Sequence, residues 1–427
     1  MISKNLHIVG ANMIKLPKKI LASSMLGGMV EFYDFTIYGF FAPIIGPLFF
    51  PSHDALVSTL LGYAVFAVGF ILRPLGAMFF GNLGDKIGRK KGLCLSLFLM
   101  AFATGMMGIL PTYAEWGIYA SFLMIFARIL QGLSAGGEYS GGIIFAVEHS
   151  HSNAKGRAGS IVVAGCMGGV FLGALASYLC SLPFLNSCTW GWRIPFLLGF
   201  FISIIGLYIR TNTSESVEFR RSKIIENPLS YGIKNYPYQC IATVGIAAFS
   251  GVFYPILSMF MPTYLTKVLG MPLSQAKLFS LVMTVTMVSL IPVFGAISDK
   301  LGRPLLMRLS AILVSVLIFP YLWSLEYFSF MVILASGMCV TCVVAMFMGC
   351  MNTYILEFFP VNVRYSCFGF FYSIGMGIFG GTAPMIGMYI LSLPFYSVIF
   401  GGYLLTGCLL GVGGVFLSKK PGNVKFA

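Results

Sequence analysis

The segment GNLGDKIGR occupies residues 81–89, between two long apolar runs, and a related segment, GAISDKLGR, occupies residues 295–303. Each segment carries glycine, aspartate, glycine and arginine at the same relative positions, and the second copy lies 214 residues after the first. The matching residues are Gly81, Asp85, Gly88 and Arg89 in the first copy and Gly295, Asp299, Gly302 and Arg303 in the second. A charged turn repeated at half the length of an apolar chain predicts two similar halves.

The composition is that of a membrane protein. Of the 427 residues, 58% are hydrophobic and only 9% are charged. A helix needs about 20 apolar residues to cross about 30 Å of hydrocarbon, and twelve segments of the chain meet that length. We therefore predict an all-α membrane protein with twelve transmembrane helices in two pseudo-symmetric six-helix halves.

The predicted boundaries follow the polar stretches. We expect a cytoplasmic tail at residues 1–20, a first half at 21–210, a cytoplasmic linker at 211–238, a second half at 239–417 and a cytoplasmic tail at 418–427. The linker is the longest charged stretch between apolar segments, which is why we place the division between the halves there.

The distribution of charge predicts the orientation in the membrane. The net charge is +14, and most lysines and arginines fall in the two tails, the linker and the loops on the same side of the membrane. This asymmetry places both termini in the cytoplasm, so we expect contact with the lipid bilayer and none with nucleic acid. We expect no enzymatic activity, no metal and no cofactor, because the chain shows no nucleophile–base pair, metal cluster or phosphate-binding loop. We also expect a monomer. Cys180 and Cys188 either form a disulfide or pack as separate thiols.

Ionisable residues at bilayer depth are costly and mark functional sites. The predicted spans of the first half contain Glu31, Asp34, Arg73, Arg128 and Glu138. The predicted spans of the second half, among them one at 278–297, contain essentially none except Glu357 at a cytoplasmic end. These residues are expected to pair with one another or to line an aqueous cavity.

Glu31 and Asp34 are three residues apart and share one helix face. Two carboxylates so close in a poorly hydrated site cannot both ionise cheaply, so we expect one of them to hold a proton near neutral pH, as proton coupling requires. The alternative is that one or both neutralise Arg73 or Arg128. Asp34 is the stronger candidate because it lies deeper.

Arg128 lies about twelve residues into its predicted span, or about 18 Å at 1.5 Å per residue, near the middle of the membrane. A guanidinium at this depth can bind the carboxylate of a substrate, and Gln131 shares its face. The alternative is a structural salt bridge. We add Arg73, Tyr33 and Tyr38 to the candidate substrate site, since aromatic faces bind quaternary ammonium groups, although such rings can also pack against lipid.

The repeated segments are candidate gating elements. Asp85 could cap the following helix or pair with Arg89, and Gly88 can adopt the positive φ of a tight turn. Glu138 is predicted to lie near the depth of this loop and to close the cytoplasmic side with it. The same role is expected of the second copy, at Asp299, Gly302 and Arg303.

The pattern at 81–89 resembles the signature loop between helices 2 and 3 of major facilitator superfamily transporters. Three further segments resemble the metabolite:proton symporter family within it, which contains proline/betaine, α-ketoglutarate, shikimate and citrate transporters. These segments are EFYDF at 31–35, RILQGLSAGGE at 128–138 and WRIPF at 192–196. The resemblance implies a two-lobed fold, alternating access and proton symport in a bacterial inner membrane.

We therefore expect a proton-coupled symporter that imports a small organic solute. A zwitterion such as proline or betaine is favoured over a dicarboxylate, because the second half offers no additional cation for a second carboxylate. Two alternatives stay open, namely a symporter of a dicarboxylate or another organic acid and a proton-independent facilitator or exchanger.

Overall fold

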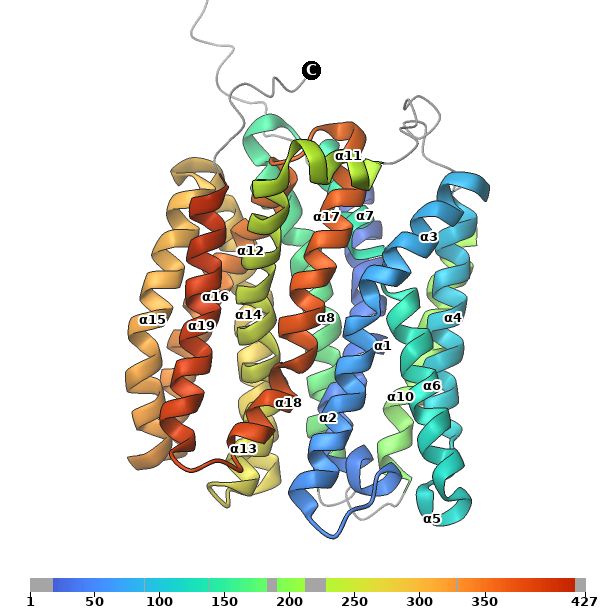
Figure 1. Cartoon of the computed structure of the whole chain (residues 1–427), viewed down its shortest axis with the longest axis vertical. Coiled ribbons are helices and arrows are strands. Elements are labelled where there is room, and N and C mark those ends of the chain that lie inside the picture. The colour runs from blue at the N-terminus through green and yellow to red at the C-terminus, as the bar shows by residue number, and fades with distance from the viewer. Residues whose placement is uncertain are drawn as a thin grey trace, which may run out of the picture.

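The computed structural model describes residues 18–87, 89–136, 138–182, 190–211, 228–327 and 329–418. Within these ranges the chain is almost entirely helical and contains no strand. The helices run roughly parallel to one long axis and form a single bundle (Figure 1). We refer to the two ends of this bundle as the α11 end and the α5 end, after the short helices that lie there.

The first half contains six membrane-length segments. Its helices are α1 (Lys18–Phe49), α2 (Ala55–Ile71), α3 (Arg73–Ile87), α4 (Arg89–Ile109), α5 (Tyr113–Trp116), α6 (Ile118–Ser134), α7 (Glu138–Glu148), α8 (Lys155–Cys180) and α10 (Ile194–Thr211). Helices α2 and α3 together make one segment, as do α6 and α7, and short 3₁₀ turns precede α8 and α10.

The second half also contains six segments and follows the short helix α11 (Pro228–Asn235). Its elements are α12 (Pro237–Pro255), η4 (Ile256–Phe260), α13 (Met261–Lys267), α14 (Leu273–Leu301), α15 (Arg303–Tyr327), α16 (Phe330–Leu356), α17 (Val361–Gly375), η5 (Met376–Gly380), α18 (Gly381–Ile390) and α19 (Tyr396–Leu417). In the stretch predicted as a linker, the structure places α11 and the start of α12.

The number of membrane-length helices agrees with the prediction. Eleven segments are long and apolar enough to cross a membrane, and α4, whose apolar part is Cys94–Ile109, supplies the twelfth. Because every main-chain polar group in hydrocarbon needs an internal partner, continuous helices are the expected way for such segments to cross. The predicted fold class of twelve transmembrane helices in two halves is confirmed.

Several segments bend at positions that the sequence explains. The segment α2–α3 changes course just before Pro74, whose ring cannot continue the helical hydrogen bonds of the preceding turn. In the second half, η4 and η5 are single π-helical turns that interrupt the segments α12–α13 and α17–α18. Such wide turns occur mostly at functional sites in helices.

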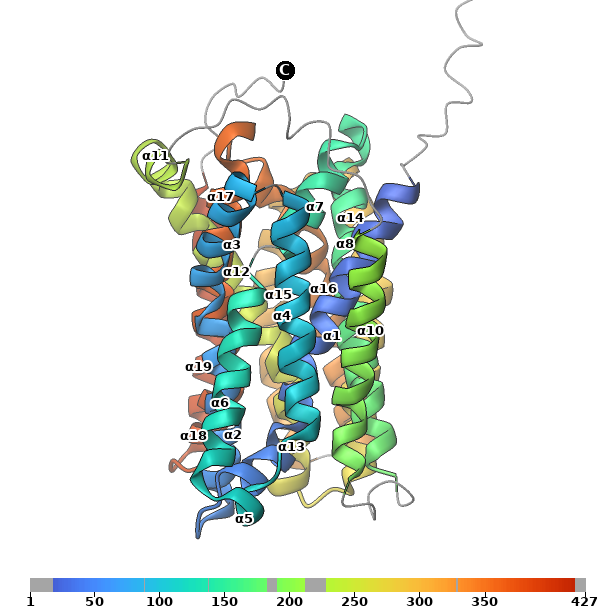
Figure 2. The same cartoon turned by 90° about the vertical axis from the view of Figure 1, so that its right-hand side faces the viewer.

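The two halves lie side by side, with the blue-to-green helices of the first half on the right of Figure 1 and most of the second half on the left. Their contact is made mainly by α8 against α14 and by α2 against α18. Within the first half, α1 packs closely against α8, where glycines of α8 leave no room for a side chain. After a quarter turn of the bundle, α4, α6 and α10 face the viewer in Figure 2. The buried charged residues Glu31, Asp34, Arg73 and Arg128 lie on α1, α3 and α6.

Candidate functional site

Arg128 is fully buried in α6 and its guanidinium is held by main-chain oxygens. Its Nη1 donates to the carbonyl oxygen of Phe35 at 3.1 Å, and its Nη2 donates to the carbonyl oxygen of Phe66 at 3.0 Å. The guanidinium can approach α2 because residue 69 is glycine, where a Cβ would lie only 2.7 Å from Nη2. Arg128 therefore joins α6 to both α1 and α2.

The surroundings of Arg128 are aromatic rather than acidic. Its guanidinium carbon lies 4.8 Å from the ring centre of Phe35, 4.7 Å from that of Tyr38 and 5.2 Å from that of Phe66. No carboxylate of the described chain forms an ion pair with it, and both its Nε and the hydroxyl of Tyr38 are buried without a hydrogen-bond partner there. Burying a cation without an anion costs free energy, which the hydrogen bonds to the guanidinium offset in part.

Gln131, one helical turn after Arg128, connects the cation to the rest of the site. Its Oε1 accepts a hydrogen bond from Arg128 Nη1 at 2.6 Å. Its Nε2 donates to the carbonyl oxygen of Asp34 at 3.2 Å and to Oγ1 of Thr104 in α4 at 2.7 Å. A displacement of Arg128 would therefore be transmitted through one amide to α1 at Asp34.

Asp34 is fully buried in α1 and faces α10. One of its carboxylate oxygens accepts a hydrogen bond from Ser203, and the other has no partner in the described structure. No lysine or arginine of the described chain forms an ion pair with it. The carboxylate of Asp34 is thus held by hydrogen bonding alone.

Glu31 is also buried, but it has a cationic partner. Its Oε1 lies 3.4 Å from Nη2 of Arg73 in α3, and the same nitrogen donates to the carbonyl oxygen of Ala135 at 3.3 Å. The two carboxylates of α1 therefore face different helices, with Glu31 toward α3 and Asp34 toward α10. The structure favours the pairing alternative for Glu31 and leaves Asp34 without a cation.

The two tyrosines assigned to the substrate site have different environments. The ring of Tyr38 faces Arg128, as described above. The hydroxyl of Tyr33 instead donates to the carbonyl oxygen of Pro195 at 2.8 Å, at the start of α10. Tyr33 thus stabilises the contact between α1 and α10, and the structure does not bring it to Arg128.

Two further hydroxyl groups of the site were not predicted from the sequence. Thr104 holds the amide of Gln131 and Ser203 holds the carboxylate of Asp34. An isolated serine or threonine in an apolar span gives no sequence signal, since such residues commonly bond to their own helix.

A pair of tyrosines links the halves near the centre of the bundle. The hydroxyl of Tyr372 in α17 donates to that of Tyr139 in α7 at 3.0 Å, and their rings stack with centres 4.9 Å apart. The ring of Tyr139 also lies 5.3 Å from that of Phe32 in α1. Phe32 is therefore buried inside the bundle, beside the pair of tyrosines that links the halves.

At the α11 end, Asp299 joins the halves. Its two carboxylate oxygens accept hydrogen bonds from the main-chain N–H groups of Gly156 and Arg157 at 2.8 and 2.9 Å. Arg303 Nη2 donates to Asp299 at 2.8 Å, and Arg303 Nη1 donates to Glu357 at 2.5 Å. Gly302 has φ 91°, a left-handed conformation that favours glycine. The second copy of the repeated segment thus caps the first turn of α8.

A second contact closes the same end, where Arg364 Nη1 lies 2.6 Å from Oε1 of Glu148. These residues belong to α17 and α7, which lie in different halves. The gating residues predicted in the first copy lie largely outside the described part of the chain. Gly88 is not described, and neither are the side chains of Asp85, Arg89 and Glu138 or the surroundings of Gly81.

The halves also touch at the α5 end. The hydroxyl of Tyr63 in α2 lies 2.8 Å from Oγ1 of Thr263 and donates to the carbonyl oxygen of Met259 at 3.1 Å. Lys267 Nζ donates to Oγ1 of Thr59 at 2.6 Å. The structure therefore describes a form of the protein in which both ends of the interface are bridged.

Lys277 corrects one premise of the sequence analysis. The span predicted at 278–297 begins at Leu273 in the structure, so α14 contains Lys277, which is buried and donates from Nζ to the carbonyl oxygen of Phe40 at 3.0 Å. The expectation that the second half lacks an additional buried cation is wrong. Residues at the predicted end of a span were counted as loop, which is why Lys277 was missed.

Cys180 is a free thiol, with its Sγ 3.5 Å from the carbonyl oxygen of Gly191, and Cys188 lies outside the described residues. Within the described chain, no group of three or more histidine, cysteine, aspartate or glutamate side chains could hold a metal ion.

Twelve membrane-crossing segments in two halves, with charged side chains buried at bilayer depth, are the architecture of a membrane transporter. The sequence matches the model of the Major Facilitator Superfamily over residues 24–384. The chain therefore belongs to the Major Facilitator Superfamily, and it is a transporter rather than an enzyme. The family resemblance noted from the sequence is confirmed.

Curated relatives extend over most of the chain. It is 32% identical over 424 residues to the proline/betaine transporter of Escherichia coli K12, which covers 96% of this chain and 84% of that protein. It is 30% identical over 422 residues to the glycine betaine/proline/ectoine/pipecolic acid transporter of Dickeya dadantii, with coverage of 95% and 84%. Among solved structures, a D-xylose–proton symporter matches with a TM-score of 0.73 at 18% identity, over 95% of this chain and 98% of that one. This last likeness concerns the fold alone.

Proposed function

We propose that the protein imports a small zwitterionic solute of the proline or betaine type together with protons, by alternating access. The observation that carries this proposal is the buried guanidinium of Arg128, which has no carboxylate partner in the described chain. A solute carboxylate would supply the missing negative charge at the unpartnered Nε, and the hydroxyl of Tyr38 would donate to it. The names of the curated relatives support a solute of this class.

Asp34 is the proposed proton carrier. Burying an ionised carboxylate without a cation is costly, so a proton is its natural partner when the site is closed. Asp34 and Arg128 are connected through Gln131, which bonds to the main-chain oxygen of one and the guanidinium of the other. Binding of solute at Arg128 would therefore act on the helix that carries the proton. Glu31, paired with Arg73, has the supporting role of fixing α1 against α3.

Alternating access would use the two sets of contacts between the halves. Breaking the hydrogen bonds from Gly156 and Arg157 to Asp299 would open the α11 end, and breaking the contacts of Tyr63 and Lys267 would open the α5 end. We propose that the α11 end faces the cytoplasm of a bacterial inner membrane, in agreement with the distribution of positive charge.

Transport by the purified protein in proteoliposomes tests this proposal. With an alkaline interior, labelled proline or glycine betaine should accumulate above its outside concentration, and collapse of the pH gradient should abolish accumulation. Asp34→Asn should lose gradient-driven accumulation yet retain counterflow of the same solute, because solute binding at Arg128 is intact. Asp54→Asn, which alters an exposed carboxylate at the start of α2, is the matched control and should accumulate normally.

Uptake that is indifferent to the pH gradient would overturn proton coupling and identify a facilitator or exchanger. Loss of both accumulation and counterflow in Asp34→Asn would show instead that Asp34 serves solute binding or folding.

Lys277 favours a second candidate, a symporter of dicarboxylates. Arg128 and Lys277 bond to the carbonyl oxygens of Phe35 and Phe40 in the same helix. Five residues of α-helix separate these oxygens by about 7.5 Å along the helix axis, so the two cations lie at neighbouring depths. If this candidate is correct, α-ketoglutarate should compete with labelled solute in the wild type, and Lys277→Met should abolish that competition while proline uptake persists.

A further inference from the structure

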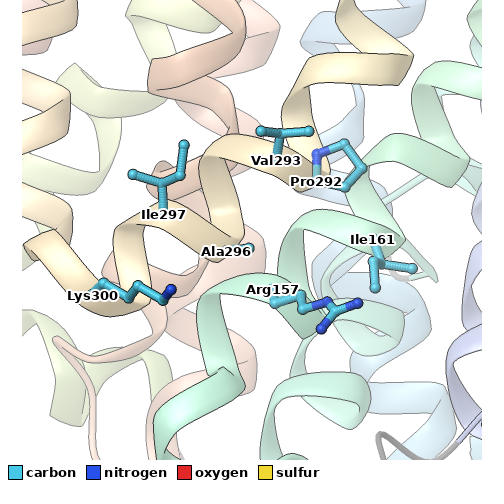
Figure 3. Close-up of a pocket in the computed structure, with 7 residues that line it drawn as sticks. All are labelled: Arg157, Ile161, Pro292, Val293, Ala296, Ile297 and Lys300. Atoms are coloured by element: carbon cyan, nitrogen blue, oxygen red, sulfur yellow. The ribbon is translucent and has the colours of Figure 1, made fainter.

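We propose that an anionic phospholipid binds in a groove between α8 and α14 at the α11 end. The groove encloses about 450 Å³ and is lined by Arg157, Ile161, Pro292, Val293, Ala296, Ile297 and Lys300 (Figure 3). It lies on the seam between the two halves, since α8 belongs to the first half and α14 to the second. This binding site is independent of the identity of the transported solute.

The chemistry of the groove matches a phospholipid. Five of its seven lining residues are apolar, and the two others, Arg157 and Lys300, are both exposed cations. No acidic residue lines it, and neither cationic side chain has an ion-pair partner in the described chain. An apolar wall flanked by two cations is complementary to an acyl chain and its phosphate.

The position of the cations along their helices agrees with this assignment. Arg157 is the third residue of α8, and Lys300 is the penultimate residue of α14. Both therefore lie where these membrane-crossing helices end, at the depth of lipid headgroups, while Ile161 and Val293 lie deeper. In Figure 3, Arg157 and Ile161 project from α8 on one side of the groove, and Lys300 and Val293 come from α14 on the other.

The groove adjoins the contact that closes the α11 end. Arg157 gives its main-chain N–H to Asp299, whereas its guanidinium lines the groove. Lys300 directly follows Asp299 in α14. A phosphate that binds both cations would hold α8 and α14 together at the same level as Asp299, so the lipid should favour the form with this end closed.

The experiment uses the full-length protein delipidated in detergent, with phosphatidylglycerol as the probe. We compare the wild type with the double variant Arg157→Gln/Lys300→Gln and with Lys234→Gln/Arg308→Gln, which removes two exposed cations elsewhere. After phosphatidylglycerol has been added back and the excess removed, the lipid that each protein retains is counted by native mass spectrometry. The melting temperature is measured with added phosphatidylglycerol, phosphatidylcholine or inorganic phosphate.

We expect the wild type and the control variant to retain one more phosphatidylglycerol molecule than the groove variant and to be stabilised by that lipid. Phosphatidylcholine should stabilise all three proteins equally. As a second test, Val293→Trp keeps both cations and fills the apolar wall, so it should also lose the retained lipid. Circular dichroism of each variant establishes that it is folded.

Equal retention by the wild type and the groove variant would overturn the proposal. So would an equal loss in the control variant, which would indicate attraction by net charge alone. Stabilisation of the wild type by inorganic phosphate to the same extent as by phosphatidylglycerol would show that the groove binds a soluble anion rather than a lipid.

Discussion

Asp299 of α14 and Gly156 of α8 are 143 residues apart in the chain, yet a carboxylate oxygen of Asp299 lies 2.8 Å from the main-chain nitrogen of Gly156. The first N–H groups of a helix have no partner within that helix, and a negative charge is favourable there. One half of the protein therefore supplies the cap for a helix of the other half. This contact can form only when the halves meet at the α11 end, so it can be measured as an indicator of closure.

The first prediction follows from this contact. Asp299→Ala removes the acceptor of two N–H groups, and hydrogen bonds to a charged group contribute about 1.5–3 kcal/mol. Hydrogen exchange of the amides of Gly156 and Arg157 should therefore accelerate roughly 10- to 100-fold, as measured by mass spectrometry. Asp54→Ala, which removes a cap from α2, should leave these two amides unchanged. Unchanged exchange in Asp299→Ala would mean that the contact does not limit opening.

The second prediction concerns the guanidinium group of Arg128 and its hydrogen bonds. Arg128→Lys keeps the positive charge but cannot bond at once to Phe35, Phe66 and Gln131, because an ammonium lacks the planar geometry. We expect the affinity for proline or betaine, measured by calorimetry, to fall roughly 10- to 100-fold, as for loss of about 1.5–3 kcal/mol. Arg308→Lys at an exposed position of α15 should bind as the wild type does. An unchanged Kd in Arg128→Lys would argue against a role of the guanidinium in solute binding.

The third prediction tests the close approach of α6 to α2. A Cβ on Gly132 would collide with the carbonyl oxygen of Gly69, whereas a Cβ on Gly402 in α19 would meet no atom within 4 Å. Gly132→Ala should therefore destabilise the protein by about 1–3 kcal/mol through overpacking, and thermal unfolding should show a lower Tm. Gly402→Ala should leave the Tm unchanged or raise it slightly. Equal Tm values for the two variants would contradict the observed helix contact.

The fourth prediction concerns the α5 end. Tyr63→Phe keeps the ring but removes the bonds to Thr263 and Met259, each of which contributes about 0.5–1.5 kcal/mol. Hydrogen exchange in α13 should rise several-fold because this end opens more often. Tyr403→Phe is the matched control, since the hydroxyl of Tyr403 is buried without a partner in the described structure. A similar rise in both variants would show a general loosening rather than a specific contact.

The sequence predicted the fold well because the bilayer imposes it. Length and apolarity define each span, and the 214-residue repeat of Asp85 and Asp299 indicates two halves. The repeat also directed attention to Asp299, Gly302 and Arg303, which the structure places at the seam between the halves.

The partners of the buried charges could not be predicted, because they depend on which way each helix face turns. Glu31 and Asp34 are one helical turn apart and were expected to share a site, yet they face α3 and α10. Tyr33 was expected in the substrate site, but its side chain lies on the face of α1 that contacts α10, where its hydroxyl bonds to Pro195. Lys277 was not predicted to be buried because α14 begins at Leu273, five residues before the predicted start of this span at 278. Lys277 therefore lies in the helix and not in the preceding loop.

The anchoring of Arg128 has a consequence for how solute preference can change. Two of its hydrogen bonds end on backbone oxygens, at Phe35 and Phe66, which exist whatever side chain those positions carry. The rings around the guanidinium can thus be exchanged for others while the charge stays where it is. On the proposed function, selectivity and charge placement are therefore separate properties, and a library that varies only the aromatic residues around Arg128 should yield new specificities without loss of the central cation.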